Sequence, residues 1–258
     1  MTNKPALLFL HGWSGDAAFW APLAKELGDF ADIHAPNLPG HGSGPDLDQA
    51  GIAGMNDMAA WVANWAKKQI SPEQAVFVGG YSLGGRIAAF LPQFFSDRPF
   101  RGEILFSAGL GIADEGERNR RIALEGLWRA RLADDSAGFW REWYEQPLFR
   151  GVGAADLEYL VNSKKQHNIN SLNRALDVLS PARHEPLGGR LLALKHFLYF
   201  AGELDEKYCE IAREIGRSYP NARVEIVPGA DHLVPRRRPE LCAAIIRDWI
   251  EGITTNEQ

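Results

Sequence analysis

Gly80-Tyr81-Ser82-Leu83-Gly84 is the stretch that decides the fold, a G-x-S-x-G pentapeptide. It directly follows the apolar run Ala75–Val78 and opens a helical stretch, Leu83–Leu91. A strand, this motif and a helix in that order predict a nucleophile elbow, a turn so tight that the residues two before and two after the Ser must be small. The turn strains the Ser backbone and lifts its hydroxyl above the sheet. We therefore predict that Ser82 is a reactive Ser; the alternative is a Gly-rich turn with an incidental Ser.

Short apolar runs alternate with amphipathic helical patterns on both sides of this motif. The runs that predict strands are Ala6–Leu10, Ile33–Ala35, Ala75–Val78, Ile104–Phe106, Phe197–Phe200 and Val224–Val227. Apolar residues at helical spacing predict one helix over Met58–Trp65, with Asn56–Asp57 as its N-cap, and another that begins at Pro239. This alternation predicts an α/β fold with a mostly parallel sheet of about six strands flanked by helices.

The alternation breaks between about Leu110 and Pro186. The helical segments there are rich in Arg and Trp, and they are Glu117–Leu132, Ala137–Tyr144, Ala154–Lys165 and Ser171–Leu179. We predict a core of residues 1–109 and 186–258, with residues 110–185 inserted as a helical cap between the fourth and fifth strands.

Composition excludes several classes of protein. The chain has 258 residues and a formal net charge of −5, which argues against a nucleic-acid partner. No apolar run approaches the roughly 20 residues of a membrane span, and the N-terminus lacks a signal-peptide pattern, so we expect a cytoplasmic monomer without membrane insertion. Cys209 and Cys242 are too few for a disulfide framework or a zinc site. Of the 28 basic side chains, 20 are Arg and 8 are Lys, which composition does not explain.

A Ser hydroxyl needs a base to take its proton and an acid to orient that base. His232, in the loop after the last predicted strand, is the candidate base. Asp205, after the preceding strand, is the preferred acid because it opens the next helix, and Glu203 and Asp231 are its rivals. The C-terminal edge of a parallel sheet would bring these loops together with Ser82. The other six His residues are expected to be turn or core hydrogen-bonders, and no pair has metal-ligand spacing, so no metal is predicted.

An oxyanion site needs two backbone N–H donors. We predict the amides of Leu83, directly after the Ser, and of Trp13, in the loop after the first strand. A simple tight turn is the alternative for the second loop.

These motifs resemble those of the α/β-hydrolase superfamily, over nearly the whole chain and in the superfamily's order. The matching segments are LFLHGWSG (8–15), LPGHGSG (38–44), GGYSLGGR (79–86), AGELD (201–205) and GADH (229–232). The resemblance implies a core sheet under a helical cap that is inserted before the last two strands. The superfamily's N-terminal hairpin is absent, since the first strand begins at Ala6.

Finer details resemble the 2-succinyl-6-hydroxy-2,4-cyclohexadiene-1-carboxylate synthases of menaquinone biosynthesis. They are Arg86 four residues after the Ser, the ERNRR stretch (117–121), the WYEQPLF stretch (143–149) and GELDEKY (202–208). The resemblance implies a lyase without metal or organic cofactor that eliminates pyruvate from 2-succinyl-5-enolpyruvyl-6-hydroxy-3-cyclohexene-1-carboxylate. It also implies that Ser82, activated by His232 and Asp205, acts as a base rather than as an acylated nucleophile.

A small polycarboxylate substrate suits a pocket rich in Arg, whose planar fork binds carboxylates better than Lys does. The candidate substrate-binding residues are Tyr81, Arg86, Arg118, Arg121, Trp143 and Lys164. Trp143 could stack on the substrate ring and Tyr81 could donate a hydrogen bond. The alternative for each Arg is a solvated cap-helix face, and Arg236–Arg238 is expected to be a solvated loop.

Two other functions stay open. A carboxylesterase or thioesterase would use the same three residues, with Ser82 as nucleophile, but for apolar acyl chains it would favour an apolar cap. A non-catalytic receptor on this fold often lacks one of the three residues, and all three are present here.

Overall fold

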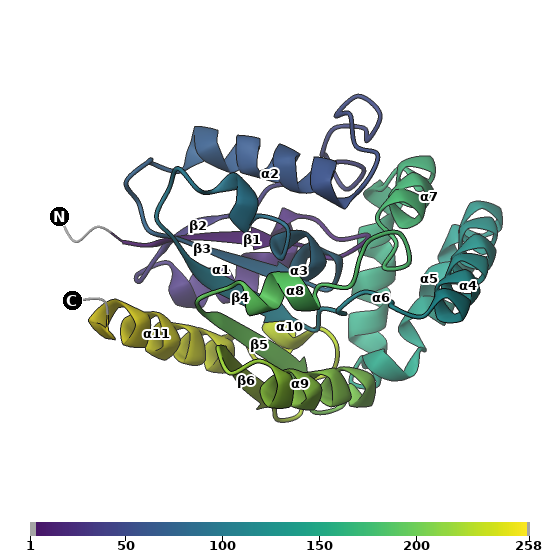
Figure 1. Cartoon of the computed structure of the whole chain (residues 1–258). Helices are drawn as coiled ribbons and strands as arrows, with labels where there is room; N and C mark the ends of the chain where they lie inside the picture. Colours follow the sequence, from purple (N-terminus) through teal and green to yellow (C-terminus); the bar gives the residue numbers. More distant parts are fainter. Residues whose placement is uncertain (1–3, 257–258) are drawn as a thin grey trace.

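A six-stranded parallel sheet forms the centre of the computed structural model, which describes residues 4–256 (Figure 1). The strands are β1 (Ala6–Leu10), β2 (Asp32–His34), β3 (Val76–Tyr81), β4 (Phe100–Phe106), β5 (Phe197–Gly202) and β6 (Ala222–Val227). They pair in the order β2-β1-β3-β4-β5-β6, and every pair is parallel. The predicted α/β fold with about six strands is therefore confirmed.

Helices cover both faces of the sheet because the strands are apolar on both faces. Leu8 and Val78 face one helical layer, whereas Leu7 and Phe77, their neighbours along the chain, face the other. The first layer holds α2 (Met55–Gln69), α3 (Leu83–Ala88), η2 (Pro92–Phe94), α8 (Gly188–Leu192) and α9 (Glu206–Ser218). The second holds η1 (Ala17–Trp20), α1 (Ala21–Leu27), α10 (Val234–Arg237) and α11 (Pro239–Asn256).

All four remaining helices lie between β4 and β5 in the chain, and we call them the insertion. They are α4 (Glu115–Asp134), α5 (Ser136–Tyr144), α6 (Ala154–Ser163) and α7 (Ile169–Val178), with the short turns η3 (Pro147–Phe149) and η4 (Lys164–Gln166). Figure 1 shows the insertion beyond the C-terminal ends of the strands. The division into residues 1–109, 110–185 and 186–258 stays a prediction, and its outermost residues, 1–3 and 257–258, lie outside the described ones.

The predicted N-cap of the helix after β2 is wrong. Helix α2 begins at Met55 with Gly54 as its N-cap, so Asn56–Asp57 lies inside the first turn. From there Asp57 reaches back and accepts a hydrogen bond from the amide of Ala53 (3.0 Å). An Asp in the first turn satisfies a free N–H and suits the helix dipole as well as a cap residue does, which is why the sequence pattern pointed two residues too far.

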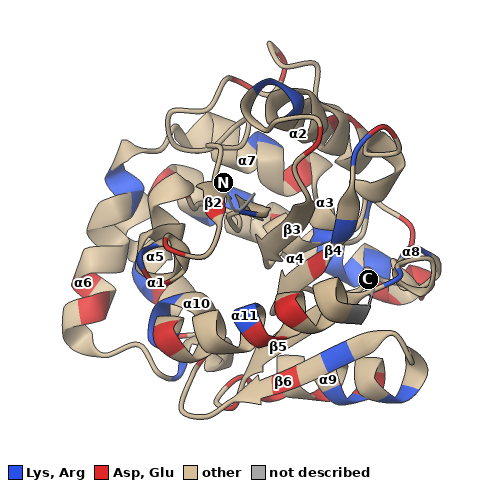
Figure 2. Cartoon of the chain, turned by 90° about the vertical axis from the view of Figure 1, so that its left-hand side faces the viewer, with Lys and Arg blue, Asp and Glu red and all other residues tan. Residues whose placement is uncertain are grey.

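The helices and the distribution of charged residues show two further features of the fold. None of the helices within residues 4–256 is both long and apolar enough to cross a membrane. Basic and acidic residues are interspersed on the side of the molecule that carries both termini (Figure 2).

Candidate active site

Ser82 sits in a strained turn between β3 and α3. Its backbone has φ 52° and ψ −109°, a conformation that L-residues rarely adopt. The turn is so tight that a Cβ on Gly80 would lie well under 3.0 Å from the backbone of Gly84, and one on Gly84 would lie equally close to the carbonyl of Leu10. This backbone geometry is the one that the pentapeptide predicts.

His232 and Asp205 form a buried hydrogen-bonded pair. The Nδ1 of His232 donates to Oδ2 of Asp205 at 2.6 Å, with 5% and 1% of the two side chains exposed. Asp205 is the N-cap of α9, and its Oδ1 accepts from the amide of Tyr208 (3.4 Å). Rings of Tyr81, Tyr208 and Phe149 surround the imidazole. Since Nδ1 is engaged, Nε2 is the nitrogen left to act as a base.

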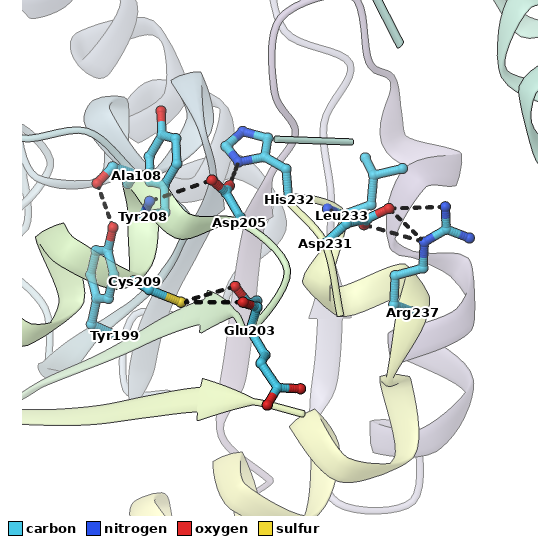
Figure 3. A network of polar contacts seen from close by, with 11 residues as sticks. Ala108, Tyr199, Glu203, Asp205, Tyr208, Cys209, Asp231, His232, Leu233 and Arg237 are labelled. Carbon is cyan, nitrogen blue, oxygen red and sulfur yellow. Dashed lines mark hydrogen bonds and ion pairs between the residues drawn. The ribbon is translucent and has the colours of Figure 1, made fainter. Parts of the chain in front are cut away.

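The two rival acids have other partners. Glu203 accepts from the amide of Gly229 (2.8 Å), and its carboxylate points away from the Asp205–His232 pair (Figure 3). Asp231 accepts from the amide of Leu233 and from Arg237. Of the three candidate acids, Asp205 is the one that contacts the imidazole.

A cavity of about 910 Å³ lies between the insertion and the C-terminal edge of the sheet. It brings together most of the residues that the sequence singled out, namely Trp13, Tyr81, Ser82, Leu83, Arg86, Arg121, Trp143, Lys164, Asp205 and His232. Arg118 does not line the cavity. Its guanidinium turns back toward the start of α4 and donates to the carbonyl of Ala113 (2.9 Å).

The cavity holds buried cations with fixed side chains. Arg86 donates to the carbonyl of Leu179 (2.8 Å) and contacts Nε2 of His184 (3.2 Å), and burial lowers its pKa to about 10. Lys164 donates to the carbonyl of Ser14 (2.6 Å), and burial lowers its pKa to about 8. Both side chains are therefore still charged at neutral pH.

Arg121 lies among Trp side chains where the insertion lines the cavity. Arg121 donates to the buried Glu125 (2.5 Å), and its guanidinium lies 4.9 Å from the ring centroid of Trp128. The ring of Trp143 lies edge-on to Trp128 and Trp13, with centroids 5.1 and 5.0 Å away.

The two predicted oxyanion donors line the same cavity. Leu83 is the first residue of α3, so its N–H has no acceptor within the helix. The loop of Trp13 comes close to β3 because Gly12 has no side chain, and a Cβ there would lie 2.8 Å from the ring of Tyr81.

Several further side chains line the cavity that were not predicted as site residues, among them Tyr208 and Arg236, and Lys207 of the GELDEKY stretch lines it as well. The expectation of a solvated loop over Arg236–Arg238 is wrong for Arg236 and Arg237, because α10 covers Val234–Arg237 and the Arg236 guanidinium lies 5.2 Å from the ring centroid of Tyr159. Arg238 follows the helix and is exposed, as expected. The position of Tyr208, three residues after Asp205 at a helix start, was a usable signal. The sequence held no comparable signal for Arg236.

Two other His residues, His11 and His41, are hydrogen-bonded in the core. His11 accepts from the amide of Leu38 through Nε2 (3.1 Å), and His41 donates to the carbonyl of Pro39 (2.9 Å). Within the described part of the chain, no group of three or more His, Cys, Asp or Glu side chains could hold a metal ion.

Comparisons with known proteins show the family of the chain. The model of the alpha/beta hydrolase family matches residues 7–245. The curated 2-succinyl-6-hydroxy-2,4-cyclohexadiene-1-carboxylate synthase of Citrobacter koseri is 31% identical over 247 residues, which cover 92% of this chain and 90% of the relative. The synthase of the same name from an Enterobacter species is also 31% identical over 247 residues, with 94% and 90% covered.

Solved structures share the fold. MenH from S. aureus matches with a TM-score of 0.86 at 22% identity, over 98% of this chain and 96% of that one. A thermophilic esterase from Thermogutta terrifontis, with malate bound, matches with a TM-score of 0.75 at 22% identity, over 97% and 91%. The chain belongs to the alpha/beta hydrolase family and, within it, to the family of the 2-succinyl-6-hydroxy-2,4-cyclohexadiene-1-carboxylate synthases.

Proposed function

We propose that this protein is a cofactor-independent lyase of menaquinone biosynthesis. It eliminates pyruvate from 2-succinyl-5-enolpyruvyl-6-hydroxy-3-cyclohexene-1-carboxylate and yields 2-succinyl-6-hydroxy-2,4-cyclohexadiene-1-carboxylate. The names of the curated relatives support the reaction. The single observation that carries it is one cavity in which strained Ser82 and the Asp205–His232 pair meet buried cationic side chains.

The base is a Ser–His–Asp triad of Ser82, His232 and Asp205. With Nδ1–H held by Asp205, Nε2 of His232 takes the proton of the Ser82 hydroxyl. The Ser82 oxygen removes the acidic ring proton of the substrate. The electrons of that C–H bond form a double bond to the next ring carbon, the existing ring double bond shifts by one position, and the C–O bond to the enolpyruvyl group breaks. The departing enolpyruvate takes up a proton and becomes pyruvate.

Charge that develops on the succinyl carbonyl oxygen is stabilised by the amides of Trp13 and Leu83. Both residues line the cavity. Leu83 is the first residue of α3, so its N–H lies at the positive end of the helix dipole. Donors that are fixed in place before the reaction cost no reorganisation when the charge forms.

Substrate carboxylates are held by Arg86, Arg121 and Lys164. The hydrogen bonds of Arg86 to Leu179 and His184 orient its guanidinium in advance, and burial strengthens its attraction for an anion. Trp143 offers an aromatic face to the substrate ring, and Tyr81 offers a hydroxyl beside Ser82. The insertion keeps water from the reacting carbanion. In this proposal the protein works as a cytoplasmic monomer.

The test is an assay of pyruvate release from the freshly generated substrate, run beside hydrolysis of a p-nitrophenyl ester, with Ser82→Ala as the blank for both. Fast pyruvate release that depends on Ser82 supports the lyase. Fast ester hydrolysis with no pyruvate would overturn it in favour of a carboxylesterase or thioesterase.

A further inference from the structure

Asp231 precedes His232 in the chain and contacts Arg237 of α10. The proposed mechanism uses neither of these two charged residues. Asp231 is fully buried, and its carboxylate accepts from the amide of Leu233 (2.9 Å) and from Nε of Arg237 (3.1 and 3.2 Å). Figure 3 shows the Arg237 guanidinium facing this carboxylate from α10. A buried carboxylate is costly without such a partner, so the two residues depend on each other.

Arg237 has a second arm that reaches the insertion. Its Nη1 donates to Oδ2 of Asp156 at 2.5 Å, and Asp156 lies in the first turn of α6. Arg237 is 19% exposed and Asp156 is 54% exposed. One guanidinium therefore joins the loop that carries His232 to a helix of the insertion.

Two further contacts join the same two segments. The backbone amide of His232 donates to the carbonyl of Leu148 (2.9 Å). Gly151 packs so closely on Asp231 that a Cβ on it would lie 2.9 Å from the carboxylate. Residues 148–156 are thus attached to residues 231–237 on both sides of His232, and Leu148 and Phe149 line the cavity.

We propose that Arg237 is a positioning residue, which couples the seating of residues 148–156 over the cavity to the orientation of His232 toward Ser82. A base must be held within a fraction of an ångström of its target, so a loosened insertion lowers the rate even when every catalytic group is present. The proposal rests on the proposed function in one respect, that His232 is the base.

Asp156→Asn tests the coupling with little risk to folding, because it cuts the exposed arm and leaves the Arg237–Asp231 pair intact. We expect kcat to fall about fivefold while KM stays unchanged, because the cations of the cavity are untouched. The low-field proton resonance of the His232 Nδ1–H, which Asp205 holds at 2.6 Å, should shift or broaden.

Glu158→Gln is the matched control. Glu158 also lies on α6, is 54% exposed and accepts from Arg141 at 2.6 Å, but its partner is on α5 rather than beside His232. This variant should keep the wild-type kcat and the wild-type resonance. Equal effects of Asp156→Asn and Glu158→Gln would overturn the coupling, as would no effect of Asp156→Asn.

A second comparison separates positioning from the burial of charge. The double variant Asp231→Asn/Arg237→Met removes the two paired charges together and should fold. Its kcat should still be below that of the wild type, because the link to Asp156 is lost. Arg237→Lys keeps the positive charge, so its kcat should fall less. Full turnover in the double variant would contradict the role of Arg237. If the wild-type protein releases no pyruvate, the proposed function fails, while the His232 resonance and ester turnover of the same variants still decide the coupling.

Discussion

The strained backbone of Ser82 allows its chemical role to be tested apart from the fold. Ala keeps the Cβ and must adopt the same φ of 52°, so Ser82→Ala should leave the elbow and the melting temperature nearly unchanged. Without the hydroxyl, pyruvate release should fall by about 10³-fold or more, because the triad acts as a unit. Steady-state kinetics and thermal unfolding of the same preparation measure both effects. Turnover close to that of the wild type would remove Ser82 from the mechanism.

Arg86 tests whether the cavity is built for anions. Arg86→Ala should lower kcat/KM for the polycarboxylate by about 10²-fold, since a buried charged hydrogen-bonding partner is lost. Hydrolysis of a neutral ester should change by less than about threefold. Arg86→Lys, which keeps the charge but not the planar fork, should fall between the wild type and Arg86→Ala for the anion. Equal losses on both substrates would show that Arg86 serves the fold rather than the anion.

Sequence reasoning reached the residues of the site that lie in local motifs. Ser82, Asp205 and His232 lie in the connections that leave β3, β5 and β6, so the parallel sheet brings them to one edge. Arg118 and Arg121 belong to one stretch of sequence, yet only Arg121 lines the cavity, because Arg118 is held by Ala113 at the start of the helix. Which way a long side chain turns depends on such neighbours, and the local pattern does not contain them.

At the scale of elements, the glycines of the elbow should tolerate no side chain. A Cβ on Gly84 would collide with the backbone of Leu10, which cannot move without displacing β1, so Gly84→Ala should cost more than about 3 kcal/mol of unfolding free energy. Gly126→Ala is the control, since Gly126 lies inside α4 with open space around it, and there Ala should stabilise by about 0.5–1 kcal/mol. Urea unfolding compares them, and similar values for the two variants would contradict the close approach of α3 to β1.

Element boundaries were predicted well where the apolar pattern was continuous and poorly where it was broken. β1 matches its apolar run residue for residue, whereas β4 begins at Phe100, four residues before the predicted start. Arg101, Gly102 and Glu103 interrupt the apolar pattern, although Gly102 and Glu103 pair with β3 and Glu103 also pairs with β5. Helix α10 was missed because a four-residue helix has little stability of its own and here depends on the Arg237–Asp231 contact.

For the whole molecule, the excess of Arg has two explanations. A few Arg side chains, such as Arg86 and Arg121, line the cavity. Others bridge helices on the surface, for example Arg131 to Glu142 and Arg141 to Glu158 within the insertion. Exposed pairs of this kind contribute little stability each, so they account for where these Arg side chains lie rather than for what holds the fold together.

Glu103 should instead govern how the stability of the whole molecule depends on pH. Its side chain is fully buried in β4, and both carboxylate oxygens lack a hydrogen-bond partner among residues 4–256. Burial raises the pKa of this carboxyl to about 8, although the charge of Arg190 acts in the opposite direction. The folded protein therefore keeps a proton that the unfolded chain, with an ordinary carboxyl pKa near 4.5, releases.

Because the folded state binds the extra proton, its contribution to stability is complete below about pH 4.5 and is lost as the pH rises through about 8. Glu103→Gln keeps the shape of the neutral side chain and does not titrate. Urea unfolding from pH 5 to 9 should show the wild type losing on the order of a few kcal/mol relative to Glu103→Gln, with the variant the more stable protein at pH 9. Glu251→Gln, at an exposed position of α11, should track the wild type at every pH. A constant difference between Glu103→Gln and the wild type across this range would mean that Glu103 is already ionised inside the fold, and a buried partner for its charge would then have to exist.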